Sequence, residues 1–90
     1  MYINYKEIEQ NIKDNVEGKG NSVIMVIENN HYNIYSYATL ISSLNIINTE
    51  VTYFNYKYFS NTTTRLQNII KDVYSLACKD RIEYNYLKVV

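Results

Sequence analysis

The stretch Val23-Ile24-Met25-Val26-Ile27-Glu28-Asn29-Asn30-His31-Tyr32 decides the fold. It opens with an apolar, mostly β-branched run that is too short for a typical helix and is typical of a strand inside a sheet. The two asparagines that follow adopt positive φ more readily than most residues and suit a tight hairpin turn. We therefore expect a second strand to begin at His31 or Tyr32 and to continue through Ile41.

The residues before this hairpin have the pattern of an amphipathic surface helix from about Tyr5 to Glu17. Asn4 can cap its start, and Glu7, three residues later, completes a loose capping box. Gly18 and Gly20 are expected to end the helix. The apolar stripe on one face consists of Tyr5, Ile8, Ile12 and Val16.

The residues after the hairpin predict a strand over 51–58, rich in aromatic and β-branched side chains, and then a second helix. Alternating residues over 81–88 predict a last strand. The resulting order is α-β-β-β-α-β, which is an α+β fold, with an antiparallel sheet packed on helices in a single domain, 1–90. The loop from Ser42 to Glu50 permits either a hairpin or a crossing, so the strand order stays open. The buried stripe of the second helix is expected to be Leu66, Ile69, Ile70, Val73, Leu76 and Ala77.

Composition argues against several classes of protein. The 90 residues carry nine basic and nine acidic side chains, so electrostatic wrapping of nucleic acid is disfavoured. No apolar stretch is long enough to span a membrane, and the first residues lack the order of a signal peptide, so we expect a cytoplasmic protein. With one His and one Cys, we expect no enzyme, no cofactor and no metal site. His31 is interpreted as a solvated turn residue and Cys78 as a small buried apolar residue.

Tyrosine is the most unusual component, with 11 in 90 residues. A genome rich in A and T favours Tyr, Asn, Ile and Lys, but tyrosine also suits a contact surface, and both causes can act together. Alternation places Tyr53 on the face of its strand opposite Tyr56. The tyrosines can form a core, a protein-binding patch or a base-stacking surface. The candidate binding surface consists of Tyr35, Tyr37, Tyr53, Tyr56 and Tyr58.

Two segments carry a resemblance. The first reads Tyr35-Ser36-Tyr37-Ala38-Thr39-Leu40-Ile41 and the second Tyr58-Phe59-Ser60-Asn61-Thr62-Thr63-Thr64-Arg65. They resemble the two motifs of a family of short domains found in bacteriophages, archaeal viruses and mobile elements. The resemblance covers about a third of the chain and implies a viral or mobile-element origin, but no established activity. Leu66 stands where that family usually has His, so no role of that His carries over.

The second segment permits two interpretations. Ser60, Thr62 and Thr63 sit where the first free N–H groups of a helix need acceptors, so they can cap it, and Ser36 and Thr39 can hydrogen-bond to this cluster. Alternatively, the same hydroxyls with Arg65 one step inside the helix can hold an anion such as phosphate. The candidate anion-binding residues are Ser60, Thr62, Thr63 and Arg65.

Three functions follow from these features. The first is a non-enzymatic phage or mobile-element protein that inhibits a host protein or protein–nucleic-acid complex, in the manner of anti-CRISPR and other anti-defence proteins; a homodimer is possible and no membrane is involved. The second is a small nucleic-acid-binding accessory or regulatory protein. The third is a sponge for an anionic signalling nucleotide, held at the start of the second helix. The basic residues available to the second are Arg65, Lys71, Lys79 and Arg81.

Overall fold

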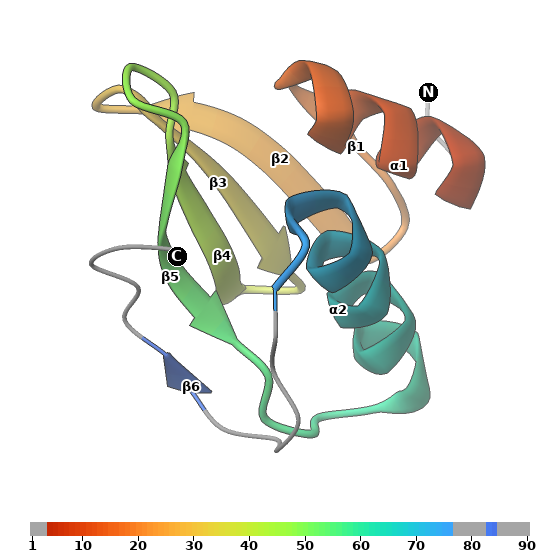
Figure 1. Cartoon of the computed structure of the whole chain (residues 1–90). Coiled ribbons are helices and arrows are strands. Elements are labelled where there is room, and N and C mark those ends of the chain that lie inside the picture. Colours follow the sequence, from red (N-terminus) through yellow and green to blue (C-terminus); the bar gives the residue numbers. More distant parts are fainter. Residues whose placement is uncertain (1–3, 77–82, 85–90) are drawn as a thin grey trace.

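The computed structural model describes residues 4–76 and 83–84, which form two helices and a sheet (Figure 1). The elements follow one another along the chain as helix, strands, helix and strand, as expected. Their bounds are α1 Tyr5–Asp14, β1 Gly18–Lys19, β2 Val23–Glu28, β3 His31–Ser36, β4 Thr39–Asn45, β5 Glu50–Asn55, α2 Asn61–Tyr74 and β6 Glu83–Tyr84.

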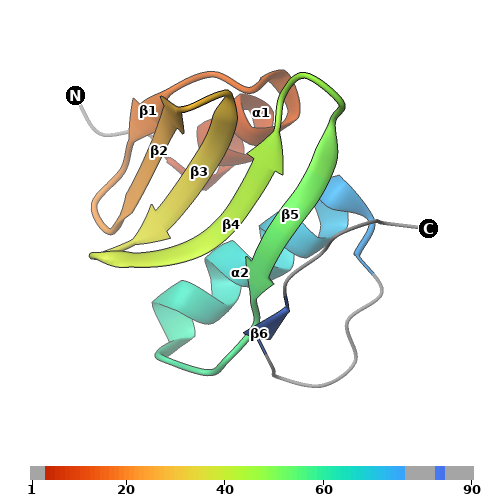
Figure 2. The same ribbon diagram turned by 90° about the vertical axis from the view of Figure 1, so that its left-hand side faces the viewer.

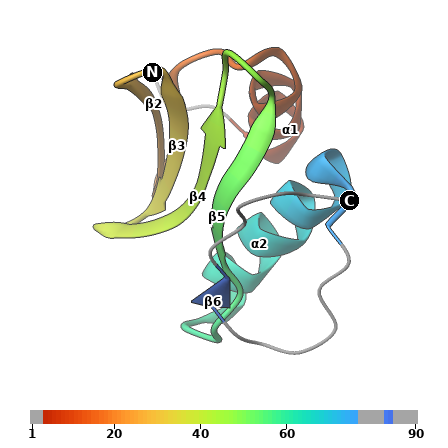
Figure 3. The ribbon, with the colours of Figure 1, turned by 60° about the vertical axis from the view of Figure 1, so that its left-hand side comes forward.

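Within the described part of the chain the sheet has six strands in the order β1-β2-β3-β4-β5-β6, and every neighbouring pair is antiparallel. The segment between β4 and β5 is therefore a hairpin connection, which settles the choice between a hairpin and a crossing. Both helices cover the same face of the curved sheet, and among the described residues no helix covers the opposite face of β2–β5 (Figures 2 and 3). The α+β class and the antiparallel sheet packed on helices are confirmed.

The start of α1 forms as predicted, but its end does not. The Asn4 side chain accepts the Glu7 N–H, and the Glu7 side chain accepts the Asn4 N–H, which completes the capping box. The helix ends at Asp14 because Asn15 takes the left-handed conformation, with φ of 53°. This cap lies before both glycines, so the expected extension to Glu17 is wrong.

The first hairpin is confirmed, whereas the strand after it is divided. Asn29 and Asn30 both have positive φ, 50° and 63°, as a two-residue hairpin turn requires. The expected single strand through Ile41 is instead β3 and β4, joined by a second two-residue turn at Tyr37 and Ala38. Tyr37 has φ of 55°. Because this turn holds no Gly, Asn or Asp, the sequence carried no turn signal there.

β5 ends at Asn55, three residues before the expected end at Tyr58. The Gln67 side-chain amide of α2 donates to the carbonyl oxygens of Asn55 and Lys57, at 2.9 and 2.8 Å. The Asn55 side chain in turn accepts the Lys57 N–H at 3.0 Å. These bonds turn the chain out of the sheet and toward α2, so residues 56–58 do not continue the strand.

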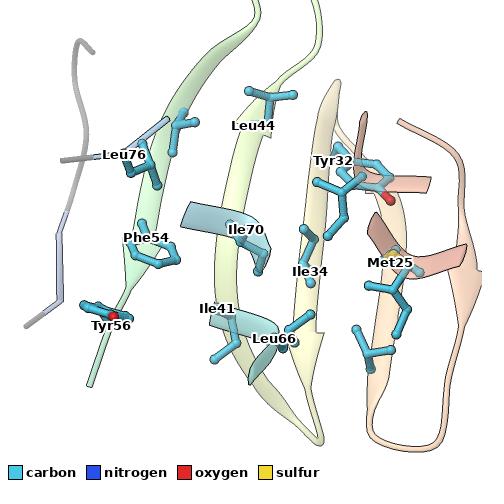
Figure 4. Close-up of a cluster of buried hydrophobic side chains, with 14 residues drawn as sticks. Met25, Tyr32, Ile34, Ile41, Leu44, Phe54, Tyr56, Leu66, Ile70 and Leu76 are labelled. Carbon is cyan, nitrogen blue, oxygen red and sulfur yellow. The ribbon is translucent and has the colours of Figure 1, made fainter. Parts of the chain in front are cut away.

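The core lies between the sheet and the two helices, and α2 supplies its centre (Figure 4). Ile70 and Leu66 of α2 point toward Ile34, Ile41 and Phe54 on the strands. Ile70 is fully buried as predicted, whereas Ile69 and Val73 are only partly buried against the core. Of the expected last strand, the described part is Glu83–Tyr84, which pairs with β5; Ala77 and Cys78 lie outside the described residues. Within the described residues, neither helix has the length and apolar character needed to cross a membrane.

Candidate functional site

The two motif segments meet at one end of the molecule and enclose a pocket of about 180 Å³. The first segment contributes the end of β3, the Tyr37–Ala38 turn and the start of β4. The second contributes the loop after β5 and the first turn of α2, which lies at the same end of the molecule (Figure 2). We call this cavity the motif pocket. Its lining residues are Ser36, Tyr37, Thr39, Ile41, Phe59, Ser60 and Thr63.

A chain of three hydroxyls joins the two segments at this pocket. The Ser36 Oγ lies 2.8 Å from the Thr63 Oγ1, and both residues are buried. Ser60, the N-cap of α2, accepts the Thr63 N–H and donates its own hydroxyl to the Thr63 Oγ1 at 3.3 Å. The capping interpretation of the second segment therefore has direct geometric support, including the predicted contact with Ser36.

Three exposed aromatic side chains of the motif segments lie at this end, and we call them the aromatic rim: Tyr37, Tyr58 and Phe59. Their exposed fractions are 62%, 59% and 46%, high values for side chains of this size. Tyr37 and Phe59 line the motif pocket itself. Because exposed aromatic groups around a pocket are characteristic of interaction surfaces, the rim is the best candidate for a contact site.

The left-handed backbone of Tyr37 positions one side of the rim. An aromatic residue in this region is uncommon, because its Cβ approaches the following carbonyl oxygen. The Tyr37 N–H donates to the Ser22 carbonyl oxygen, before β2, at 2.7 Å. This bond links the Tyr37–Ala38 turn to the connection before β2 and holds the turn in place. The Tyr37 ring remains 62% exposed. Such strain is commonly found where a side chain is presented for function.

The remaining candidate tyrosines occupy other places. Tyr35 and Tyr53 lie on the helix-free face of the sheet, where they line a shallow, more polar depression. The Tyr35 hydroxyl donates to the Glu28 carboxylate at 3.0 Å, and this hydrogen bond raises the pKa of Tyr35. Tyr56 is in the core instead, stacked on Phe54 with its hydroxyl bonded to Asn68. The expectation that Tyr53 and Tyr56 point to opposite faces agrees with this arrangement.

The candidate anion-binding residues are brought together only in part. Ser60 and Thr63 join through their hydroxyls, and Thr62 is exposed on the first turn of α2. The Arg65 guanidinium instead lies over the Tyr5 ring of α1, 4.0 Å from its centroid. It is not among the residues that line the motif pocket. In this structure the pocket therefore has no cationic wall among the described residues.

Sequence reasoning missed two residues of this site. Phe59 lies in the second motif segment, but the tyrosine pattern that indicated a contact surface does not include it. Ile41 was expected to be an ordinary strand residue, yet it forms the apolar floor of the pocket at the β-bulge opposite Ile34 and Tyr35. Each of the two residues belongs to one of the motif segments, and this was the signal in the sequence that could have identified them. His31, by contrast, sits beside its turn as expected, with Nδ1 2.9 Å from the Asn29 carbonyl oxygen.

Comparison with protein families, with curated proteins and with solved structures finds no match for this chain.

Proposed function

We propose that this protein is a non-enzymatic binding protein of viral or mobile-element origin that inhibits a host protein, as anti-defence proteins such as anti-CRISPR inhibitors do. The aromatic rim around the motif pocket is the observation that carries the proposal. A domain of this size gains affinity by placing aromatic side chains at the centre of a contact surface. The resemblance to mobile-element domains rests on the same two segments that build the rim.

The charge distribution favours a protein partner over a nucleic acid. The chain has no net charge, and the described residues that line the motif pocket are all uncharged. Two cations of α2 contact tyrosine rings inside the domain: Arg65 lies over Tyr5, and the Lys71 Nζ is 5.2 Å from the Tyr56 ring centroid. Binding dominated by phosphates needs several cations directed outward, whereas an aromatic surface without charge suits a protein.

The test uses the full chain, tagged, to capture partners from a host lysate at high salt after nuclease treatment. Phe59→Ser and Tyr58→Ser are expected to reduce capture of the same host protein by roughly 30-fold in affinity, as for loss of an aromatic anchor. Ile47→Ser is the matched control, because Ile47 is 75% exposed in the β4–β5 connection, at the opposite end of β4 from the motif pocket. Capture that disappears with nuclease or falls steeply with salt would instead support the nucleic-acid function. Equal loss in all three variants would contradict a localised rim.

A further inference from the structure

The motif pocket has the size of a single ring rather than of a nucleotide. Its volume is about 180 Å³. An apolar protein cavity of about 150 Å³ accepts benzene, whereas ligand sites for drug-sized molecules run from about 300 to 1,000 Å³. The pocket is therefore too small to enclose a signalling nucleotide, but it can accept one aromatic side chain of a partner.

The walls define the chemistry of that ring. Tyr37, Phe59 and Ile41 supply apolar surface, and among the described residues of the lining the polar side-chain groups are hydroxyls. A charged ring would lose its hydration on entry without meeting an opposite charge, which is costly. Because the lining is uncharged, the complementary occupant is uncharged as well.

The hydroxyl chain leaves one donor for the occupant. Ser36, Ser60 and Thr63 have three hydroxyl protons, and the two contacts among their oxygens use two of them. If Thr63 donates to Ser36, the Ser36 proton remains; if Ser36 donates, the Thr63 proton remains. Either way, one O–H of a buried residue at the pocket can donate to an oxygen atom of the occupant. Thr39 adds a further hydroxyl at the exposed side.

We propose that the motif pocket binds a neutral phenol ring, which in the protein partner is the side chain of a tyrosine. The proposal rests on the proposed function for the identity of the partner, but not for the chemistry of the pocket. The ring of the partner's tyrosine lies between Tyr37 and Phe59, and its hydroxyl oxygen accepts the remaining proton of the Ser36–Thr63 pair.

Three probes of similar size test the chemistry on the full chain: p-cresol, toluene and 4-methylbenzoate. Binding is followed by the chemical shifts of the backbone amides that line the pocket. We expect saturable shifts with p-cresol, about threefold to tenfold weaker binding of toluene, because one neutral hydrogen bond is lost, and weaker binding still of 4-methylbenzoate. Absence of saturable shifts would overturn the proposal, as would equal affinity for p-cresol and toluene. Preference for 4-methylbenzoate would overturn it in favour of an anion site.

Two variants and one further probe complete the test. The double variant Ser36→Ala/Thr63→Val removes both hydroxyls of the Ser36–Thr63 pair and is expected to remove the preference for p-cresol over toluene. Thr39→Phe is expected to fill the pocket from its exposed side and abolish p-cresol binding in a protein that remains folded; unchanged binding would place the probe elsewhere. N-acetyltyrosinamide separates the two sources of a phenol: its binding supports a partner's tyrosine, and its exclusion overturns that assignment. Probe binding without capture of a host protein would count against the proposed function alone, whereas capture without probe binding would count against the pocket alone.

Discussion

Ser36 on β3 and Thr63 in the first turn of α2 share a buried hydrogen bond of 2.8 Å, across 27 positions of the sequence. Ser36 pairs with Thr39 next to the Tyr37–Ala38 turn, and Thr63 bonds to the N-cap of its helix. One bond therefore links the hairpin that carries Tyr37 to the helix start that follows the loop with Phe59. Both bonded residues line the motif pocket.

The first prediction concerns this bond. Ser36→Ala and Thr63→Val should each lower the free energy of unfolding by about 1–3 kcal/mol, because each breaks the buried hydrogen bond between the two side chains. The double variant should lose less than the sum, since both changes break the same hydrogen bond. Urea unfolding measures all three. Thr62→Ala, at an exposed neighbouring position, should change stability by less than about 0.5 kcal/mol. Additive losses would mean that the two hydroxyls do not interact.

Much of this arrangement could be predicted from local chemistry. The Asn4 cap, the Asn29–Asn30 turn and the Ser60 cap each follow from residue types that satisfy or permit a particular backbone geometry. The contact between Ser36 and the Ser60–Thr63 cluster could also be predicted from the sequence, because hydroxyl groups near a helix start need hydrogen-bond partners.

The remaining features depend on tertiary contacts that leave no local pattern. Tyr37 turns the chain in a conformation that its residue type disfavours, and the bond to Ser22 supports it. β5 ends early because the Gln67 side chain, twelve residues beyond Asn55, donates to the carbonyl oxygens of Asn55 and Lys57. The expectation that Tyr56 belongs to the binding surface is wrong, because Tyr56 packs beneath α2. Alternation separates the two faces of a strand but does not indicate which face meets the helices.

The second prediction concerns the buried stripe of α2. Ile70→Ala should cost about 2–5 kcal/mol in unfolding free energy, because Ile70 is fully buried and its loss leaves a cavity. Ile69→Ala should cost clearly less, because Ile69 is only partly buried. Denaturant titration of both variants checks the order. A larger loss at Ile69 would place the helix in a different rotation about its axis.

The third prediction concerns alkaline pH. Burial raises the pKa of Tyr32 and of Tyr74 above the usual value for tyrosine. Above about pH 10 the unfolded chain loses these protons while the folded chain keeps them, so stability is complete below that pH and falls as pH rises further. Urea midpoints measured from pH 7 to 11 should show this decline.

Two single variants separate the contributions of the Tyr32 and Tyr74 hydroxyls to the free energy of unfolding at neutral pH. The Tyr32 hydroxyl donates to the Val16 carbonyl oxygen at 2.8 Å, so Tyr32→Phe should cost about 0.5–1.5 kcal/mol. The Tyr74 hydroxyl has no hydrogen-bond partner within the described part of the chain, so Tyr74→Phe should be neutral or stabilising. Both variants should make the alkaline decline shallower; an unchanged decline in both would assign it to other groups.

The fourth prediction concerns the edge of the sheet. β1 covers only part of β2, and the Glu17 carboxylate accepts the Ile27 N–H at 2.7 Å where a neighbouring strand would otherwise bind. Ile24 and Ile27 are each 40% exposed on β2. Glu17→Ala should leave this edge open and raise the dimer fraction in sedimentation experiments, because bare edges pair with other strands.

Two control variants make this test specific to Glu17. Glu17→Gln keeps an acceptor oxygen and should behave as the native chain does. Glu9→Ala removes the same charge from an exposed pair with Lys13 and should also leave the association state unchanged. An increase in dimer with Glu9→Ala would point to net charge rather than to the Ile27 N–H.

The last prediction uses the backbone of Tyr37 to separate stability from function. A left-handed conformation costs a residue with a Cβ roughly 1–2 kcal/mol and costs glycine almost nothing, while glycine adds about 0.4–1 kcal/mol of entropy to the unfolded chain. With φ of 55°, Tyr37→Gly should therefore leave the free energy of unfolding unchanged or raise it by up to about 1 kcal/mol. Partner capture should nevertheless fall, because one wall of the motif pocket is lost.

Ala38→Gly is the control at the next position. Ala38 lies outside the left-handed region, so this variant should lower stability slightly and leave capture intact. Melting temperature and capture measured on both variants decide the matter: a stable Tyr37→Gly protein that still captures its partner fully would show that this strained tyrosine serves the turn and not the binding surface.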